Sequence, residues 1–234
     1  LMLSLISLPL FTLTIGCSSS PEAPPEPIFV SSEPKLRRLT LTQYHNSLKE
    51  LFGEDLLLPL LLEPDVEIEG LLSVGASVTN VTPTGAERYE TAAYQIAEQV
   101  ITSDDLVHSI LPCDPDPDPQ GCTLTFVQSF GERVWRRSLS DEEATRIQSL
   151  ILDISQASGD YFTGLEFGLA AMLQSPHFLY RTEHSSGTLN SFELASRLSF
   201  LLWNSPPDTE LLSVARDGSL GDAKILEEQL IVSM

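Results

Sequence analysis

A ten-residue stretch around one histidine holds the side chains best suited to chemistry. His177 follows a Ser-Pro pair and precedes aromatic and charged residues. An imidazole in this setting could ligate a metal or a haem iron, with Glu183 or His184 near in sequence. It could equally be a histidine at a helix end whose ring nitrogens form hydrogen bonds with backbone groups. We therefore treat this stretch as a candidate functional turn made of Gln174, His177, Tyr180, Arg181 and Glu183.

Two groups of charged residues are better suited to binding a ligand or partner than to catalysis. Arg133, Arg136 and Arg137 form a basic cluster, and guanidinium forks suit carboxylates. The cluster could pair internally with Asp and Glu, or it could dock an anionic ligand or partner. Glu193 and Arg197 are spaced i, i+4 on an apolar helix, which predicts a partly buried structural ion pair. Substrate binding by Arg197 is the weaker alternative.

The three cysteines suggest one lipid anchor and one disulfide. If Cys17 carries lipid, Cys113 and Cys122 remain as a pair, and an oxidising compartment would join them. Between them Asp114, Asp116 and Asp118 alternate with proline. The EF-hand template fails here, because it needs Gly at its sixth position and Glu at its twelfth. We expect a solvated acidic loop, with calcium at these aspartates as the weaker interpretation.

Known catalytic patterns are absent from the sequence. There is no GxSxG elbow, HExxH, Walker A or GxGxxG motif. No CxxCH occurs, so the chain cannot attach a c-type haem. The four histidines stand in mismatched contexts, and we predict no metal site and no evident cofactor. Whether the protein is an enzyme stays open.

The N-terminus indicates export. Residues 1–15 are apolar and uncharged, with the length of a signal-peptide core rather than of a membrane span. The end of this run together with the next two residues, LTIGC (13–17), resembles a bacterial lipobox. Two features depart from that motif: Thr14 stands where Leu is usual, and no basic residue precedes the apolar run. An ordinary cleaved signal and a buried N-terminal helix are the alternatives. Residues 1–17 are thus interpreted as a lipoprotein signal, and residues 18–34, rich in Pro, Ser and Glu, as a tether.

The strongly negative net charge of the chain excludes some classes of binding partner. The chain of 234 residues has 33 acidic and 13 basic residues, a net charge of −20. Such a surface repels the phosphates of nucleic acid and anionic lipid headgroups. We therefore expect no nucleic-acid partner, and we expect membrane attachment only through the N-terminal lipid, in the cell envelope facing the periplasm or exterior.

Helical signals dominate and predict an all-α fold, a bundle-like array of helices. Capping boxes at Thr40, Thr84, Ser140 and Asn190 predict helix starts. Further helices are expected over residues 123–137, 160–174, 208–218 and from 222 onward. Residues 54–83 lack a clear period and are predicted to be irregular, with room for one short strand. The last pattern has no end signal at Met234, so we expect the chain to continue.

Several blocks of the sequence resemble a family of planctomycete and myxobacterial surface proteins made of consecutive domains of unknown function. The blocks are RRLTLTQYHNSLKELFG (37–53), RYETAAYQIA (88–97), FGERVWRRSL (130–139), LQSPHFLYR (173–181) and ELASRLSFLLW (193–203). Ser138 departs from the proline usual in the family. The resemblance implies three helical domains, at 35–110, 111–186 and 187–234, the last incomplete. It also implies relatives that carry c-type cytochrome domains on the same polypeptide.

The family has no assigned reaction, so the resemblance names no chemistry. We expect an exported helical scaffold that docks a partner, such as an envelope protein or a cytochrome. The alternative is a part of a redox or metal-dependent envelope enzyme whose site needs a further C-terminal region or a cytochrome partner.

Overall fold

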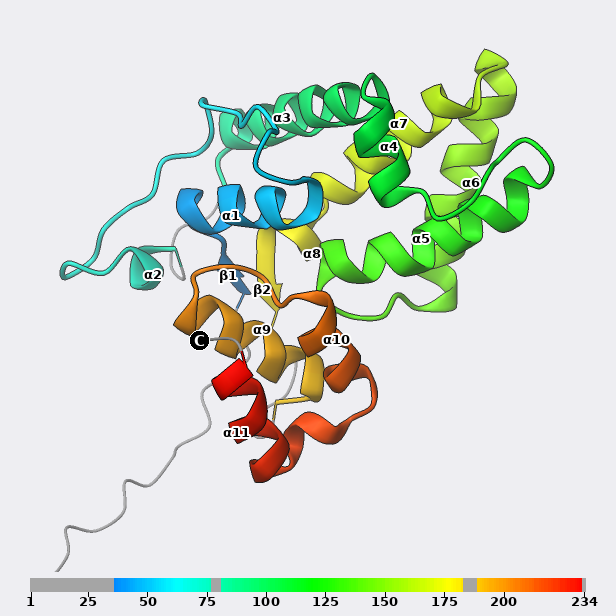
Figure 1. Cartoon of the computed structure of the whole chain (residues 1–234). Coiled ribbons are helices and arrows are strands. Elements are labelled where there is room, and N and C mark those ends of the chain that lie inside the picture. The colour runs from blue at the N-terminus through cyan, green and yellow to red at the C-terminus, as the bar shows by residue number, and fades with distance from the viewer. Residues whose placement is uncertain (1–35, 77–80, 183–188, 233–234) are drawn as a thin grey trace, which may run out of the picture. The chain divides into compact units, whose positions relative to one another are not determined.

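A computed structural model describes residues 36–76, 81–182 and 189–232. The described chain is mostly helical, which confirms the all-α prediction (Figure 1). A single exception is a small antiparallel sheet of β1 (Leu36–Arg38) and β2 (Tyr180–Thr182). The sequence does not predict this sheet, because three residues are too few to show the alternation of a strand.

Helix α1 (Leu41–Phe52) begins as its capping box predicts. The Thr40 side chain accepts a hydrogen bond from the Gln43 backbone, and the Gln43 side chain accepts one from the Thr40 N–H. The helix ends at Gly53, whose φ of 95° suits glycine. Tyr44 and Leu48 are buried on its inner face.

Residues 54–82 contain little regular structure in their described part, as predicted. The described part, residues 54–76 and 81–82, includes the one-turn helix α2 (Leu72–Gly75) and an isolated bridge between Ile68 and Leu71, but no strand. Leu56 and Leu62 are buried in the core and anchor this segment. The irregular path brings Asp65 back to the end of β1, where it pairs with Arg38.

The N-cap of helix α3 (Pro83–Ile101) lies two residues before the predicted cap. Thr82, not Thr84, is the N-cap, and its hydroxyl accepts a hydrogen bond from Gly85 N at 3.0 Å. Proline is well tolerated at the first helical position, which explains the earlier start at Pro83. The prediction that Thr84 caps this helix was therefore wrong. The short helix α4 (Asp104–Ile110) follows from Ser103.

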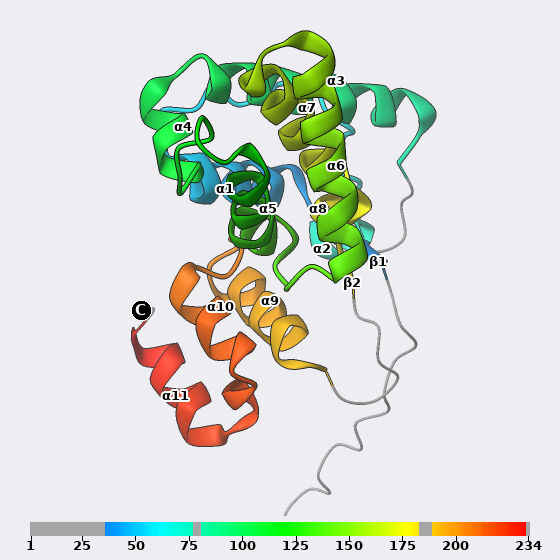
Figure 2. The ribbon, with the colours of Figure 1, turned by 90° about the vertical axis from the view of Figure 1, so that its right-hand side faces the viewer.

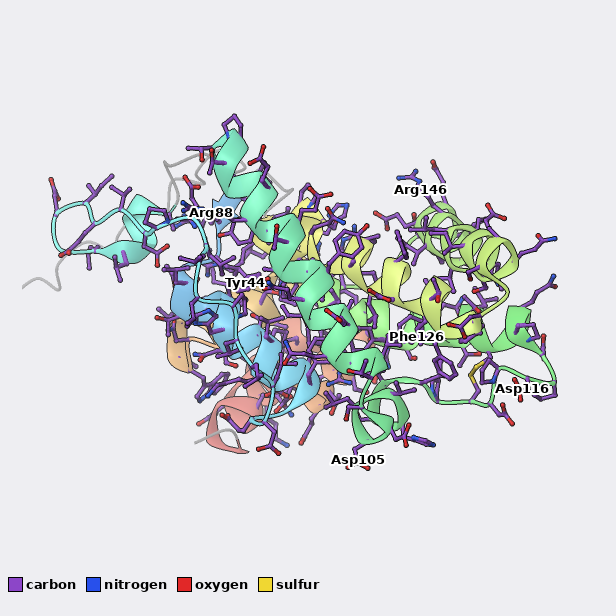
Figure 3. The ribbon with its side chains drawn as sticks, turned by 90° about the horizontal axis from the view of Figure 1, so that it is seen from above. Tyr44, Arg88, Asp105, Asp116, Phe126 and Arg146 are labelled. Atoms are coloured by element: carbon purple, nitrogen blue, oxygen red, sulfur yellow. A yellow bond between two sulfur atoms is a disulfide. The ribbon has the colours of Figure 1, made fainter. Side chains whose placement is uncertain are left out.

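Helix α5 (Pro119–Trp135) also starts earlier than predicted. Asp118 caps it by accepting from Gly121 N, and Pro119 again takes the first position. The predicted disulfide between Cys113 and Cys122 is confirmed, with Cα atoms 5.6 Å apart. It joins the first turn of α5 to the preceding loop. Figure 3 labels Asp116 on this loop, beyond the end of α5.

Loss of this disulfide should destabilise the protein. We expect the double variant Cys113→Ser/Cys122→Ser to lose about 2–3 kcal/mol in free energy of unfolding, because the loop closed by the bridge gains freedom when unfolded. Urea unfolding with and without reductant measures this. Reduced wild-type protein should match the variant, and an unchanged midpoint on reduction would contradict the expectation.

Helices α6 (Asp141–Ser158) and α7 (Tyr161–Leu173) lie side by side along much of their length (Figure 2). Gly164 makes this approach possible, because a Cβ there would lie 2.2 Å from the Ile151 carbonyl oxygen. The opposite side of α7 contacts α3. The predicted cap at Ser140 is confirmed, as is the end of α6 at Gly159.

The chain then crosses back toward its beginning. After α7, the short helix α8 (Pro176–Leu179) leads into β2. Strand β2 pairs with β1 so that Arg37 stands opposite Arg181 and Arg38 opposite Tyr180. This pairing carries the candidate functional turn to the first residues of the described chain.

The remaining helices have a small core of their own. Helix α9 (Ser191–Leu202), capped by Asn190 as predicted, packs with α10 (Thr209–Arg216), a 3₁₀ turn (Ser219–Gly221) and α11 (Ala223–Val232) (Figures 1 and 2). Their shared buried side chains are Ala195, Leu211, Ala215 and Leu220. Arg216 of α10 forms an ion pair with Glu132 of α5.

Candidate functional site

One cavity brings together part of the basic cluster and part of the candidate turn. Arg136 and Arg137 at the end of α5 line it together with His177, Tyr180 and Arg181 of α8 and β2, and its volume is about 170 Å³. The rest of the lining comes from the same segments and from α9: Trp135, Ser138, Thr182, Asn190, Phe192, Glu193 and Ser196. We call this cavity the arginine pocket.

Arg136 fixes the shape of the arginine pocket. It is the C-cap of α5, with a left-handed backbone at φ 56°, and its side chain is only 4% exposed. Its Nη2 donates to the carbonyl oxygens of His177 at 2.8 Å, Phe178 at 3.1 Å and Tyr180 at 2.9 Å. Its Nη1 donates to Val134 O at 3.3 Å. This single guanidinium therefore ties the turn through α8 and β2 to the end of α5.

The three clustered arginines find different partners. Arg137 forms the predicted pair with an acid, donating to both oxygens of Glu143 at 2.7 and 2.9 Å. Arg133 donates to the carbonyls of Glu50 and Leu51, outside the pocket. For Arg136, the described residues supply carbonyls only. Burial and the positive charges of Arg181 and Arg137 lower the pKa of Arg136, so the surroundings of this group lack negative charge.

His177 has a protein neighbour at each ring nitrogen. Its Nε2 lies 3.4 Å from Glu143 Oε1, and its Nδ1 lies 3.3 Å from Arg137 Nη2. The ring also packs on Trp135, with centroids 4.9 Å apart. These contacts suit an imidazole that donates from Nε2 and accepts at Nδ1. They favour a positioning role for His177 over that of a metal ligand.

Glu143 is the carboxylate that organises this wall of the pocket. Hydrogen bonds from Arg137, assisted by the Ser140 N–H, lower its pKa from 4.5 to about 2. The same carboxylate closes the capping box of α6. Glu143 therefore holds Arg137 and His177 at the edge of the pocket.

The lowered pKa of Glu143 predicts a pH-dependent stability. A carboxylate with a depressed pKa stabilises the fold above its unfolded pKa, and this contribution is lost as the pH falls from 4.5 toward 2. We expect Glu143→Gln to unfold more easily than wild type at pH 7, with a difference that shrinks below pH 4.5 and approaches zero near pH 2. Glutamine keeps the helix cap, so the difference reports the charge.

Urea unfolding at several pH values measures this effect. Glu142→Gln is the matched control, because Glu142 is its exposed neighbour and pairs with Arg146 at i, i+4. That variant should show little pH dependence of its own. A constant difference between Glu143→Gln and wild type from pH 7 to pH 2 would contradict the expectation.

Two arginines of the pocket lie over one aromatic ring, that of Phe200, which is not part of the pocket lining. Arg181 lies over the ring of Phe200 at 5.2 Å, and Arg136 lies over it at 5.7 Å. Such contacts with the ring face partly offset the mutual repulsion of the two guanidinium groups. Glu193 lines the pocket too, but its carboxylate accepts from Asn190 N in the cap of α9.

Some predicted residues lie elsewhere. Gln174 is the C-cap of α7 and does not line the pocket. Glu183 and Cys17 lie outside the described residues. Arg197 is exposed on α9 and lines a different cavity. The i, i+4 pairing of Glu193 with Arg197 stays a prediction.

Over residues 36–76, 81–182 and 189–232, no three His, Cys, Asp or Glu side chains lie close enough together to hold a metal ion. Asp114, Asp116 and Asp118 are exposed on the loop closed by the disulfide. Calcium binding there stays a prediction.

Among the described helices, none has the length and apolar character that crossing a bilayer requires.

Comparison with known proteins gives three matches along the chain. Residues 37–102 match PSD3, a protein of unknown function (DUF1587). Residues 122–183 match PSD5 (DUF1595), and residues 189–231 match PSD4 (DUF1592), both also described as proteins of unknown function. Neither a curated protein nor a solved structure matches the chain. The protein therefore carries three consecutive domains of unknown function, one each of the PSD3, PSD5 and PSD4 kinds.

Proposed function

We propose that this protein is an exported, lipid-anchored envelope protein that docks a partner by binding one of its acidic groups in the arginine pocket. The observation that carries the proposal is the gathering of three arginines at one cavity in a chain with a net charge of −20. The disulfide supports export, because such bonds persist in oxidising compartments. Cys17 is the proposed site of lipid attachment.

The charges that line the pocket favour an anion. Arg136, Arg137 and Arg181 contribute three positive charges, whereas Glu193 is the one carboxylate that the described residues contribute to the lining. Glu143 offsets Arg137 from just outside it. A carboxylate entering the pocket would make charge-assisted hydrogen bonds, which are the stronger kind.

The size and the other lining groups favour a side chain or a chain terminus over a large ligand. A volume of about 170 Å³ accommodates a group the size of a glutamate side chain. Ser138 and Asn190 add polar groups, and the rings of Trp135 and Phe192 can cover methylene groups of the incoming residue.

A site-specific photo-crosslinker tests the docking proposal in cells. Placed at Ser196, which lines the pocket, it should trap one partner whose cross-linked peptide contains an acidic residue. The same probe at Gln148, on α6 away from the pocket, is the control. The adduct should disappear when Arg137→Gln is added. An adduct that persists unchanged in the Arg137→Gln background would contradict docking through this pocket.

Lipid attachment is tested separately. Metabolic labelling with a fatty acid should mark the wild-type protein and not Cys17→Ser, and the variant should leave the membrane fraction. An unlabelled wild-type protein would remove the lipoprotein part of the proposal while leaving the pocket untouched.

A further inference from the structure

The most exposed large apolar side chains of the described residues lie together in the irregular segment after α1. Leu57 is 75% exposed, Leu60 is 90% exposed and Leu61 is 79% exposed. We call these three residues the leucine ridge. The segment from Leu56 to Leu62 consists of six leucines and one proline, so no charge interrupts it. Exposed leucines cost free energy in water, and a patch of them marks an interaction surface.

The fold fixes the outward direction of the leucine ridge. Leu56 and Leu62 stand at the two ends of the segment, and both are buried in the core. Between them, Gln99 of α3 forms hydrogen bonds with both backbone groups of Leu57, accepting from its N–H at 3.0 Å and donating to its carbonyl at 3.1 Å. The leucines of the ridge therefore face solvent because the backbone of the segment is held in place.

Similar contacts lower the cost of moving the segment into an apolar phase, where unpaired backbone groups are expensive. Arg88 of α3, which Figure 3 labels, donates to the carbonyl oxygen of Leu62 at 3.2 Å. His45 Nε2 of α1 lies 3.0 Å from the carbonyl oxygen of Pro59, and this proline has no N–H. Side chains of the fold thus satisfy several polar groups that the segment would otherwise carry into lipid.

The apolar surface continues into a groove between the segment and α3. Leu58, Pro59, Leu60 and Leu61 line one side of the groove, which has a volume of about 720 Å³. Except for Ala92, the other side is polar and comes from Thr84, Glu87, Arg88, Thr91 and Gln95. An apolar chain that lies along the leucines would therefore have hydrogen-bonding groups beside it, which suits an amphiphile.

We propose that the leucine ridge is a second contact of this protein with the membrane, at which its side chains enter a zwitterionic lipid surface. The proposal rests on the lipid anchor proposed above. The chain between Cys17 and Leu36 reaches at most about 65 Å when fully extended, so a lipid on Cys17 keeps a bilayer near the ridge. A tether of this kind raises the effective concentration of the lipid surface, which strengthens a contact that is weak by itself.

The residue types favour lipid over a protein partner. Trp, Tyr and Arg dominate the binding energy of protein interfaces, whereas leucine is under-represented there, and the ridge consists of leucine alone. Interfacial binding to lipid instead scales with the apolar area that is buried. Asp55 and Glu63 flank the segment in a chain with a net charge of −20, so an anionic surface is repelled. The proposal is therefore restricted to zwitterionic lipid.

Vesicle sedimentation tests the contact without the anchor. The mature chain from residue 17 onward is used with Cys17→Ser, so no acyl chain contributes. We expect saturable binding to phosphatidylcholine vesicles, and Leu60→Ser/Leu61→Ser should lower the partition constant at least about tenfold. Leu201→Ser/Leu202→Ser is the matched control, because these two leucines are an exposed pair on α9, and it should bind as wild type does. Replacing half of the lipid by phosphatidylglycerol should weaken binding.

A fluorescent probe reports whether the ridge itself enters the lipid. In the Cys17→Ser chain, a nitrobenzoxadiazole label attached to Leu60→Cys has one free thiol to react with, because Cys113 and Cys122 are joined to each other. Its emission should increase and shift to shorter wavelength with phosphatidylcholine vesicles. The same label on Leu124→Cys, an exposed position on α5, should show no change and excludes binding driven by the label.

Four results would overturn the proposal. They are the absence of vesicle binding, equal partition of Leu60→Ser/Leu61→Ser and wild type, tighter binding to phosphatidylglycerol than to phosphatidylcholine, and a lipid-free dimer that the same double variant dissociates. The last result would make a second copy of the chain the occupant of the ridge. Circular dichroism checks folding, and Leu60→Ser alone decides if the double variant does not fold. Since all these chains lack the acyl group, the outcome is separate from that of the fatty-acid labelling of Cys17.

Discussion

Replacement of Arg136 by methionine should lower the free energy of unfolding by about 3–5 kcal/mol. Methionine fills a similar volume but donates no hydrogen bond. The carbonyl oxygens of Val134, His177, Phe178 and Tyr180 would each lose a donor in a place that water reaches poorly. The turn through α8 and β2 would lose its tie to α5, and the arginine pocket would lose one wall.

Chemical denaturation measures the effect, with Arg146→Met as the matched control. Arg146 has a 69% exposed side chain and one i, i+4 pair with Glu142, so its loss should cost about 0.3–0.5 kcal/mol. Arg136→Lys should fall between the two, because one ammonium cannot reach all four carbonyls. A cost below about 1 kcal/mol for Arg136→Met would show that these hydrogen bonds do not organise the pocket.

Replacement of Asp65 by alanine should be about equally severe, at about 3–5 kcal/mol. Asp65 Oδ1 accepts from Arg38 Nη2 at 3.0 Å, and its Oδ2 accepts from Leu41 N at 2.8 Å at the start of α1. The Arg38 side chain is 1% exposed. Alanine would leave that cation buried without its counterion, which is the costly way to break a buried pair.

The control for this variant lies in the same irregular segment. Asp55 is exposed, so Asp55→Ala should change stability by less than about 0.5 kcal/mol. The double variant Arg38→Met/Asp65→Ala should recover part of the loss, because no buried charge remains. If Asp65→Ala alone costs no more than Asp55→Ala, the ion pair does not hold the irregular segment to β1.

The helix starts could be predicted from the sequence where a capping box marks them. Thr40, Ser140 and Asn190 each begin a helix with a Gln or Glu three residues later, and all three starts are confirmed. The starts of α3 and α5 were missed because Thr82 and Asp118 each precede a proline. At both starts the proline occupies the first helical position, and the sequence shows no capping box around the true N-cap.

The site could be predicted only in pieces. The sequence singled out the basic cluster and the histidine turn separately, and the structure brings Arg136 and Arg137 together with His177 and Arg181. Nothing local indicates that convergence, since about 40 residues separate the two stretches. That Arg37 lies opposite Arg181 could not be predicted for a similar reason, because it depends on the pairing of β1 with β2.

Direct binding of a carboxylate in the arginine pocket is the central claim, and titration with glutarate tests it most directly. Trp135 lines the pocket, so a Trp203→Phe background reports this site alone. We predict a saturable change in fluorescence that weakens with added salt and falls at least about tenfold in affinity in Arg137→Gln, while Arg146→Gln keeps wild-type affinity. A titration without saturation, or one that is identical in Arg137→Gln, would contradict the claim.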